Sequence, residues 1–112
     1  MPKKWKPVRP PADTEPIAES WWEYHERGRK VMSRVAIGRP QPDPSGQDWY
    51  CPVLIEGYET KWIAAYGVGA IDSLMNAAGL CSRFFHELGP RITDMRDSRL
   101  PKPKPRGIRR RD

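Results

Sequence analysis

The chain has 112 residues and carries 20 lysines and arginines against 14 aspartates and glutamates, a formal net charge of +6. This length fits a single domain, and the 2 cysteines are too few for the disulfide framework of a small secreted scaffold. The sequence lacks the run of about 20 apolar residues that a membrane-spanning helix requires, and its charged, proline-broken start lacks the apolar stretch of a signal peptide. We therefore expect a cytoplasmic protein with reduced thiols.

Charge divides the chain into three parts. Residues 13–89 carry 7 basic and 11 acidic residues, a net of −4, whereas residues 1–12 contribute +4 and residues 90–112 contribute +6. We predict an extended, basic, proline-rich arm over residues 1–16, a single folded domain over residues 17–89, and an extended basic tail over residues 90–112. Proline fixes φ and lacks an amide proton, so the prolines of the first segment exclude it from helices and sheet interiors.

The first predicted elements of the domain are two antiparallel strands. Residues 20–26 alternate, with Trp22 on one side and Trp21 on the other, and residues 31–37 repeat the alternation after a turn at Gly28. For the first segment a short helix is the alternative, which its aromatic content and the following glycine disfavour. Adjacent tryptophans face opposite sides of a strand, so we expect at least one of them to be partly exposed for contact with a partner.

Residues 38–48 form a predicted loop, because three prolines alternate with polar residues. Arg39 stands between a glycine and this proline run, where its planar guanidinium could be held for a carboxylate or a phosphate. The alternative, which we favour, is a structural role in which Arg39 pairs with Asp43 or Asp48 and pins the loop.

Two more strands are predicted, over residues 49–55 and 61–66, joined by a turn at residues 57–60. Both segments alternate between apolar positions on two faces. Pro52 cannot donate a hydrogen bond to a neighbouring strand, so we expect it at a sheet edge, near a strand start or at a bulge.

From residue 70 the apolar period becomes that of a helix, which ends at Gly89-Pro90. Asp72 suits the first turn, and Gly79 is expected to permit close approach to the sheet. The spacing predicts one buried stripe, made of Ile71, Leu74, Met75, Ala78, Cys81, Phe85 and Leu88. The predicted fold is therefore α+β: a four-stranded antiparallel β-meander with one long C-terminal helix packed on one face.

The sequence offers little for catalysis. His25 and His86 are the only histidines, and neither belongs to a motif with a nucleophile. Nothing in the sequence lowers the pKa of Cys51, so packing in the core is its better interpretation. The cysteines and histidines lack the ligand spacing of a zinc site, and the phosphate-binding glycine motifs are missing. We expect no enzymatic activity, no metal and no cofactor.

Several short motifs occur in a defined order along residues 17–88: Ile17-Ala18-Glu19, Ile37-Gly38-Arg39-Pro40, Asp48-Trp49-Tyr50-Cys51-Pro52 and Tyr66-Gly67-Val68. In these motifs the chain resembles a bacterial family of small proteins catalogued only as a domain of unknown function. The family often has an aspartate where this chain has Gly69, so the resemblance implies that the usual helix cap is lost. It supports the predicted fold and implies no catalytic residues.

The expected function is non-catalytic binding of a protein partner with an acidic surface, through the α+β core and the basic arms, in the manner of an inhibitor or immunity protein. The alternative is nucleic-acid binding, with the arms following the backbone and tryptophans stacking on bases, although the core is net acidic. The candidate partner-binding residues are Trp5, Trp21, Arg39, Lys102, Lys104, Arg106, Arg109, Arg110 and Arg111.

Overall fold

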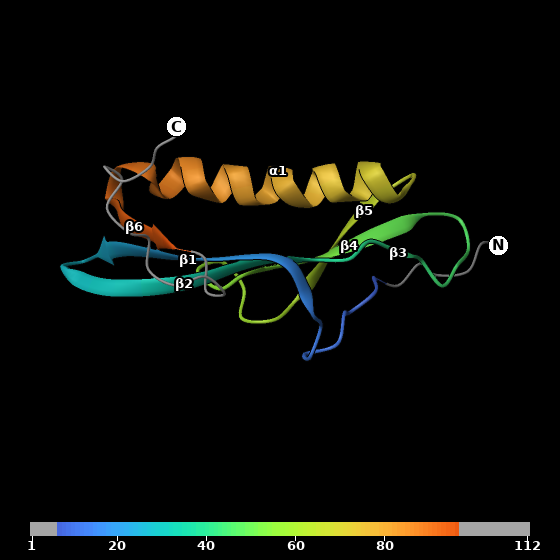
Figure 1. Cartoon of the computed structure of the whole chain (residues 1–112), viewed down its shortest axis with the longest axis horizontal. Coiled ribbons are helices and arrows are strands. Elements are labelled where there is room, and N and C mark those ends of the chain that lie inside the picture. Colours follow the sequence, from blue (N-terminus) through green and yellow to red (C-terminus); the bar gives the residue numbers. More distant parts are fainter. Residues whose placement is uncertain (1–6, 97–112) are drawn as a thin grey trace, which may run out of the picture.

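The structure, a computed structural model, describes residues 7–96. These residues form one antiparallel sheet with a single helix laid along one of its faces (Figure 1). The elements in chain order are β1 (Pro16–Glu26), β2 (Arg29–Gly38), β3 (Gln41–Pro42), β4 (Trp49–Ile55), β5 (Ile63–Gly67), α1 (Ala70–Leu88), the short 3-10 helix η1 (Gly89–Arg91) and β6 (Ile92–Arg96).

The sheet is a meander with two additions. Neighbouring strands follow the order β6-β1-β2-β4-β5, and β3 pairs with β4 on the same side as β2. The α+β class and the meander of β1, β2, β4 and β5 are confirmed. The predicted count of four strands is wrong, because the described part of the chain has six.

The short strand β3 continues the line of β2. Ile37 of β2 lies opposite Val53 of β4, and Gln41 of β3 then lies opposite Tyr50. Three residues on the β2–β3 side therefore face two on β4, and the Gly38-Arg39-Pro40 corner takes up the extra residue as a bulge would. A hydrogen bond of 2.8 Å from the Asp43 amide to the Asp48 carbonyl closes the hairpin. The loop predicted over residues 38–48 is thus reduced to residues 39–40 and 43–48.

The strand β6 returns to the sheet after the helix. It pairs antiparallel with the middle of β1, where Met95 lies opposite Trp22 and Ile92 lies opposite Tyr24. The basic tail predicted from residue 90 therefore begins with a 3-10 turn and an edge strand. Alternation over five residues was too short a signal to distinguish this strand from a charged tail.

The helix α1 has the predicted bounds, but it turns a different side to the sheet. Its buried residues are Ser73, Ala77, Phe84 and Leu88, with Leu74, Leu80 and Cys81 partly buried against the same core. The predicted stripe is wrong for Ile71, Met75 and Phe85, which are 69%, 65% and 37% exposed, and Ala78 is exposed as well.

Close approach of the helix occurs at its N-terminus. A Cβ at Gly67 would lie 2.4 Å from the Ser73 amide nitrogen, whereas one at Gly79 would meet nothing within 4 Å. The expected role of Gly79 is therefore wrong. Gly69 at the N-cap makes no side-chain cap, and Asp72 instead accepts a hydrogen bond of 3.0 Å from the Val68 amide.

The sheet face away from the helix is partly covered by residues 7–15, which run beneath it in Figure 1. Pro10 is buried there, and the Val8 amide donates a hydrogen bond to the hydroxyl of Tyr66. On the same face Trp62 is buried with Ala36 and Leu54. This part of the predicted arm therefore lies on the domain, and residues 1–6 lie outside the described part.

Candidate interaction surface

Cys51, His25 and His86 are the residues that the sequence offered for catalysis. Cys51 is fully buried, and its thiol donates to the Gly38 carbonyl oxygen at 3.3 Å. Burial, and secondarily the nearby Cys81, raises the pKa of Cys51 to about 11, so the thiol stays protonated at neutral pH. Both histidines are exposed. Among residues 7–96, no three histidine, cysteine, aspartate or glutamate side chains could hold a metal together.

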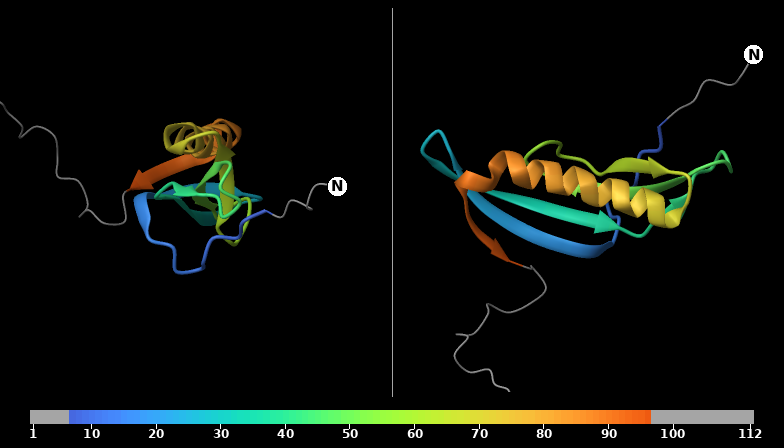
Figure 2. Two further views of the ribbon diagram at one scale, coloured as in Figure 1. Left: turned by 90° about the vertical axis from the view of Figure 1, so that its right-hand side faces the viewer. Right: turned by 90° about the horizontal axis from the view of Figure 1, so that it is seen from above.

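The helix covers only part of its sheet face. It packs on β4 and β5 and touches β2 at its margin, while β1 and β6 extend beyond it on one side (Figure 2). A sheet of five strand positions is about 19 Å wide at roughly 4.8 Å per strand, whereas a helix is about 10 Å across. One helix therefore leaves a strip of this face only partly covered along β1 and β6, at Ala18, Ser20 and Met95. Trp22 and Tyr24 of β1 are already buried, against Phe84 of the helix.

The uncovered strip adjoins an apolar side of the helix. Phe85 lies edge-on to Trp22 of β1 at 5.5 Å, and Asn76 on the opposite side donates to the Tyr66 carbonyl of β5 at 2.6 Å. The side that carries Phe85 therefore faces β1. Along it the helix presents Ile71, Met75, Ala78, Ser82 and Phe85.

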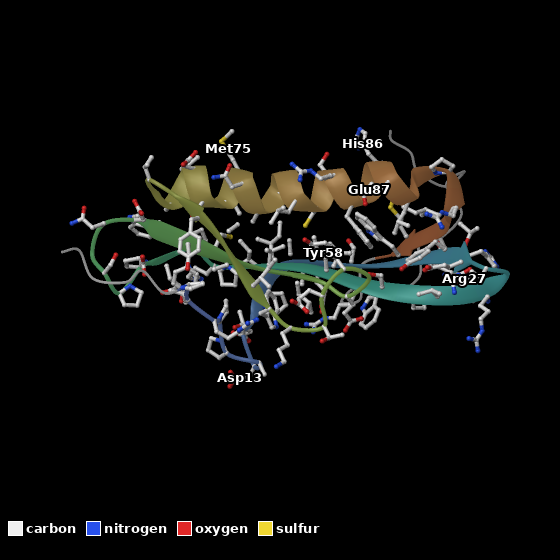
Figure 3. The ribbon with its side chains drawn as sticks, turned by 180° about the vertical axis from the view of Figure 1, so that it is seen from behind. Asp13, Arg27, Tyr58, Met75, His86 and Glu87 are labelled. Atoms are coloured by element: carbon white, nitrogen blue, oxygen red, sulfur yellow. The ribbon has the colours of Figure 1, made fainter. Side chains whose placement is uncertain are left out.

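We call this region the flank surface. It consists of the five helix residues Ile71, Met75, Ala78, Ser82 and Phe85, with Ala18 and Ser20 of β1 and Met95 of β6 on the sheet beside them. Ala18 and Ser20 alternate in step with Trp22, so they share the helix-facing side of β1. Figure 3 shows Met75 pointing away from the sheet. None of the eight residues is charged.

The sequence carried a signal for the flank surface, but it was assigned to the core. Residues 71, 75, 78, 82 and 85 are spaced four, three, four and three apart, which is the spacing of an apolar helix seam. The stripe that is in fact buried contains Ser73 and Ala77, small residues that give a weaker hydrophobic signal. Hydrophobic periodicity therefore favours burial of Ile71, Met75 and Phe85, whereas the tight contact at Gly67 requires small residues at the start of the helix.

Arg39 lies at the corner between β2 and β3, exposed, at the edge of a groove of about 490 Å³. Pro11, Pro16, Ile17 and Tyr50 are among the residues that line this groove. Within residues 7–96 Arg39 makes no ion pair, since Asp43 instead accepts a hydrogen bond from the Ser45 hydroxyl. The favoured structural pairing of Arg39 is therefore wrong.

Trp21 and Trp22 divide as expected. Trp22 is buried against Phe84 in a stacked pair with ring centroids 5.7 Å apart. Trp21 is half-buried on the opposite sheet face, beside Arg34 of β2. Arg34 forms an ion pair with Glu19 and lies over the ring of Trp62, 5.9 Å from its centroid. These contacts engage the Arg34 guanidinium within the domain, so it is not available for a partner.

The tip of the β1–β2 hairpin gathers basic side chains. Arg27, Arg29 and Lys30 are all exposed at this end, which projects beyond the sheet in Figure 3. Arg27 has a φ of 53°, in the left-handed region that non-glycine residues adopt at a cost. Two-residue hairpin turns favour asparagine, aspartate or glycine at this position, so an arginine here is unexpected on conformational grounds alone.

The remaining predicted contacts fall outside the described residues: Trp5, Lys102, Lys104, Arg106, Arg109, Arg110 and Arg111. The structure brings Trp21 and Arg39 to the same side of the sheet but does not join them in one site. None of the described helices is both long and apolar enough to cross a membrane.

No protein-family model, curated protein or solved structure matches the chain. The resemblance to a bacterial family of unknown function therefore stays a prediction.

Proposed function

We propose that this protein is a non-catalytic interaction module that binds a partner protein through the flank surface. The observation that carries the proposal is the position of three large apolar side chains, Ile71, Met75 and Phe85, on one helix side beside an uncovered strip of sheet. Monomeric proteins rarely leave contiguous apolar surface exposed, and where they do it commonly marks an interface. The basic segments at both ends of the chain would add electrostatic attraction to an acidic partner.

Matched isoleucines provide the test. Ile71 on the flank surface and Ile17 at the start of β1 are 69% and 52% exposed, so Ile71→Asp and Ile17→Asp introduce the same charge at two comparably exposed sites. We expect a tagged full-length chain to capture its partner, Ile17→Asp to capture it equally, and Ile71→Asp to lose it. Equal capture by both variants would contradict the proposed surface.

Nucleic-acid binding is the second candidate, favoured by the hairpin tip. Three cations at Arg27, Arg29 and Lys30 lie at one exposed end of the molecule, and the tip tolerates an unfavourable backbone conformation at one of them. Residues held in an unfavourable backbone conformation are often found at functional sites, and Arg27 is such a residue. The net charge of −4 over residues 13–89 is against this candidate, because it repels a polyanion from most of the domain.

Salt dependence separates the two candidates. If four to six cations met phosphates of duplex DNA, log K would fall against log salt with a slope of about −4 to −5. We expect random-sequence DNA and RNA to bind weakly with a shallower slope. Tight, steeply salt-dependent binding that Arg27→Glu/Arg29→Glu abolishes would favour the nucleic-acid function instead.

A further inference from the structure

The flank surface leaves room for one more helix on the sheet. The strip is about as wide as one helix where β6 pairs with residues 21–24 of β1, and α1 runs along its border for 19 residues, or roughly 28 Å. A helix placed there would contact Ala18, Ser20 and Met95 below and the seam of α1 beside it. An occupant of this strip would therefore lie beside the exposed side of α1, residues 71–85.

We propose that the occupant is the α1 helix of a second copy of this chain. This inference rests on the proposed function and names the partner of the same surface, a chain whose domain over residues 13–89 is itself net acidic at −4. In the dimer each α1 lies on the uncovered strip of the other copy, and the two sheets enclose the helix pair. The interface is isologous, because both copies contribute the same residues.

The seam is suited to pairing with itself. Its residues Ile71, Met75, Ala78, Ser82 and Phe85 repeat at the spacing with which parallel helices pack in register. In such a pair each seam residue lies against the same residue of the other copy. A charged seam residue would therefore be repelled by its counterpart, and none of the five is charged. The acidic Asp72 and the basic Arg83 of α1 lie off the seam.

The position of the helix on the sheet decides its orientation in the pair. If the two helices were antiparallel, the two-fold axis would run perpendicular to the sheets and place both sheets on the same side of the helix layer. Each sheet extends past its own helix along β1 and β6, so the two sheets would then occupy the same space. A two-fold axis parallel to the helices puts one sheet on each side, and the helices are then parallel.

The exposed apolar side chains supply about two thirds of the area that a stable dimer buries. The exposed fractions are 69% for Ile71, 65% for Met75, 37% for Phe85 and 51% for Met95. For side chains of roughly 200 Å² each, these fractions come to about 400 Å² per copy and about 800 Å² for two copies. Stable interfaces bury about 1,200 Å² or more, and the small seam residues with Ala18 and Ser20 supply further contact.

The first experiment measures self-association of the full chain by sedimentation equilibrium over a range of concentrations. We expect a monomer–dimer equilibrium whose Kd rises at least about 100-fold in Ile71→Asp and Met75→Asp. The matched controls are Ile17→Asp and Met32→Asp, at residues 52% and 45% exposed outside the flank surface, and they should change Kd by less than about 3-fold. Circular dichroism confirms that each variant is folded.

The second experiment tests the orientation. In a parallel, in-register pair the two copies of residue 71 are adjacent, whereas in an antiparallel pair centred on Ala78 they lie about 21 Å apart. We expect Ile71→Cys to form a disulfide-linked dimer under mild oxidation, and the wild type, with one buried and one partly buried thiol, to remain unlinked.

The outcomes also separate this inference from the proposed function. A chain that stays monomeric at every concentration overturns the dimer, while loss of partner capture by Ile71→Asp would still support the function. A dimer that both aspartate variants leave intact overturns the dimer through this surface. A dimer that Ile71→Asp breaks but Ile71→Cys fails to link overturns the parallel arrangement.

Discussion

Cys51 shows how the core controls the chemistry of a single residue. Its side chain is fully buried in the main cluster, together with Val53 of the same strand and Ala77 of the helix. Burial disfavours the thiolate, which raises the pKa of Cys51 to about 11 and that of Cys81 to about 11 as well. The two thiols are therefore packing groups whose titration is coupled to folding.

The free energy of unfolding should fall between pH 9 and pH 11. Below the ordinary thiol pKa of 9.0 both states keep their protons and the thiols have no effect. Above it the unfolded chain loses protons that the folded chain keeps until about pH 11, so alkaline pH favours unfolding. Urea denaturation at a series of pH values measures the slope. If the free energy of unfolding of a Cys51→Ala/Cys81→Ala variant falls with pH as steeply as that of the wild type, the two thiols are not the cause of the pH dependence.

Two glycines near the helix should respond oppositely to alanine. Gly67→Ala places a Cβ 2.4 Å from the Ser73 amide nitrogen, so the helix start must shift, and we expect a loss of about 1–3 kcal/mol. Gly79→Ala meets open space in the middle of α1, and we expect a gain of about 1 kcal/mol. Urea denaturation at low protein concentration tests both. A stabilising Gly67→Ala would show that β5 and α1 do not meet as closely as described.

At the scale of elements, the rotation of α1 about its axis is the feature with most consequence. The side towards the sheet carries Ser73, Ala77 and Phe84, and the side towards β1 carries the flank surface. Phe84 connects the helix to the sheet, since it stacks on Trp22 and meets Tyr24 edge-on. Its ring also packs closely on Gly57, where an added Cβ would lie 2.5 Å from the ring. The helix is thus positioned by one aromatic residue and a row of small ones.

Phe84→Ala should cost about 3–5 kcal/mol in the free energy of unfolding, because it empties a buried site shared by two aromatic partners. Tyr58→Ala is the control: it removes a ring of similar size that is 74% exposed, and we expect a change within about 0.5 kcal/mol. Denaturant titration of both variants measures the difference. Similar losses in the two variants would mean that the sequence-predicted stripe, not the observed one, faces the sheet.

The whole molecule combines a net-acidic domain with basic ends. Residues 13–89 carry −4, and removing residues 100–112 would lower the charge of the chain from +6 to +1. Long-range attraction to an acidic partner acts mainly on the association rate, and salt screens it.

Deleting residues 100–112 should therefore slow association with an acidic partner at low salt and leave the urea midpoint within experimental error. The described sheet and helix contain none of these residues. Stopped-flow or surface-binding kinetics at two salt concentrations, with the Arg27→Glu/Arg29→Glu variant for comparison, show which basic region acts. Unchanged association rates in the deletion would contradict a role for the tail.

The sequence by itself determined the class of fold, the hairpin of β1 and β2, the strands β4 and β5 and both ends of α1. These are local properties, since alternation, the turn glycine and Gly89-Pro90 act on residues near them in the chain. It also separated Trp21 from Trp22, because neighbours in a strand face opposite sides.

Only the tertiary structure decided which side of α1 is buried, that β6 returns to β1, and that residues 7–15 lie across the far face. Each depends on contacts between distant parts of the chain: Ser73 against Gly67, Met95 opposite Trp22, and Val8 with Tyr66. The helix carries two stripes that could each be buried, and hydrophobic periodicity alone does not choose between them. Close packing on the sheet selected the stripe that brings Ser73 and Ala77 to the tight contact and Phe84 into the core, and that choice left the flank surface exposed.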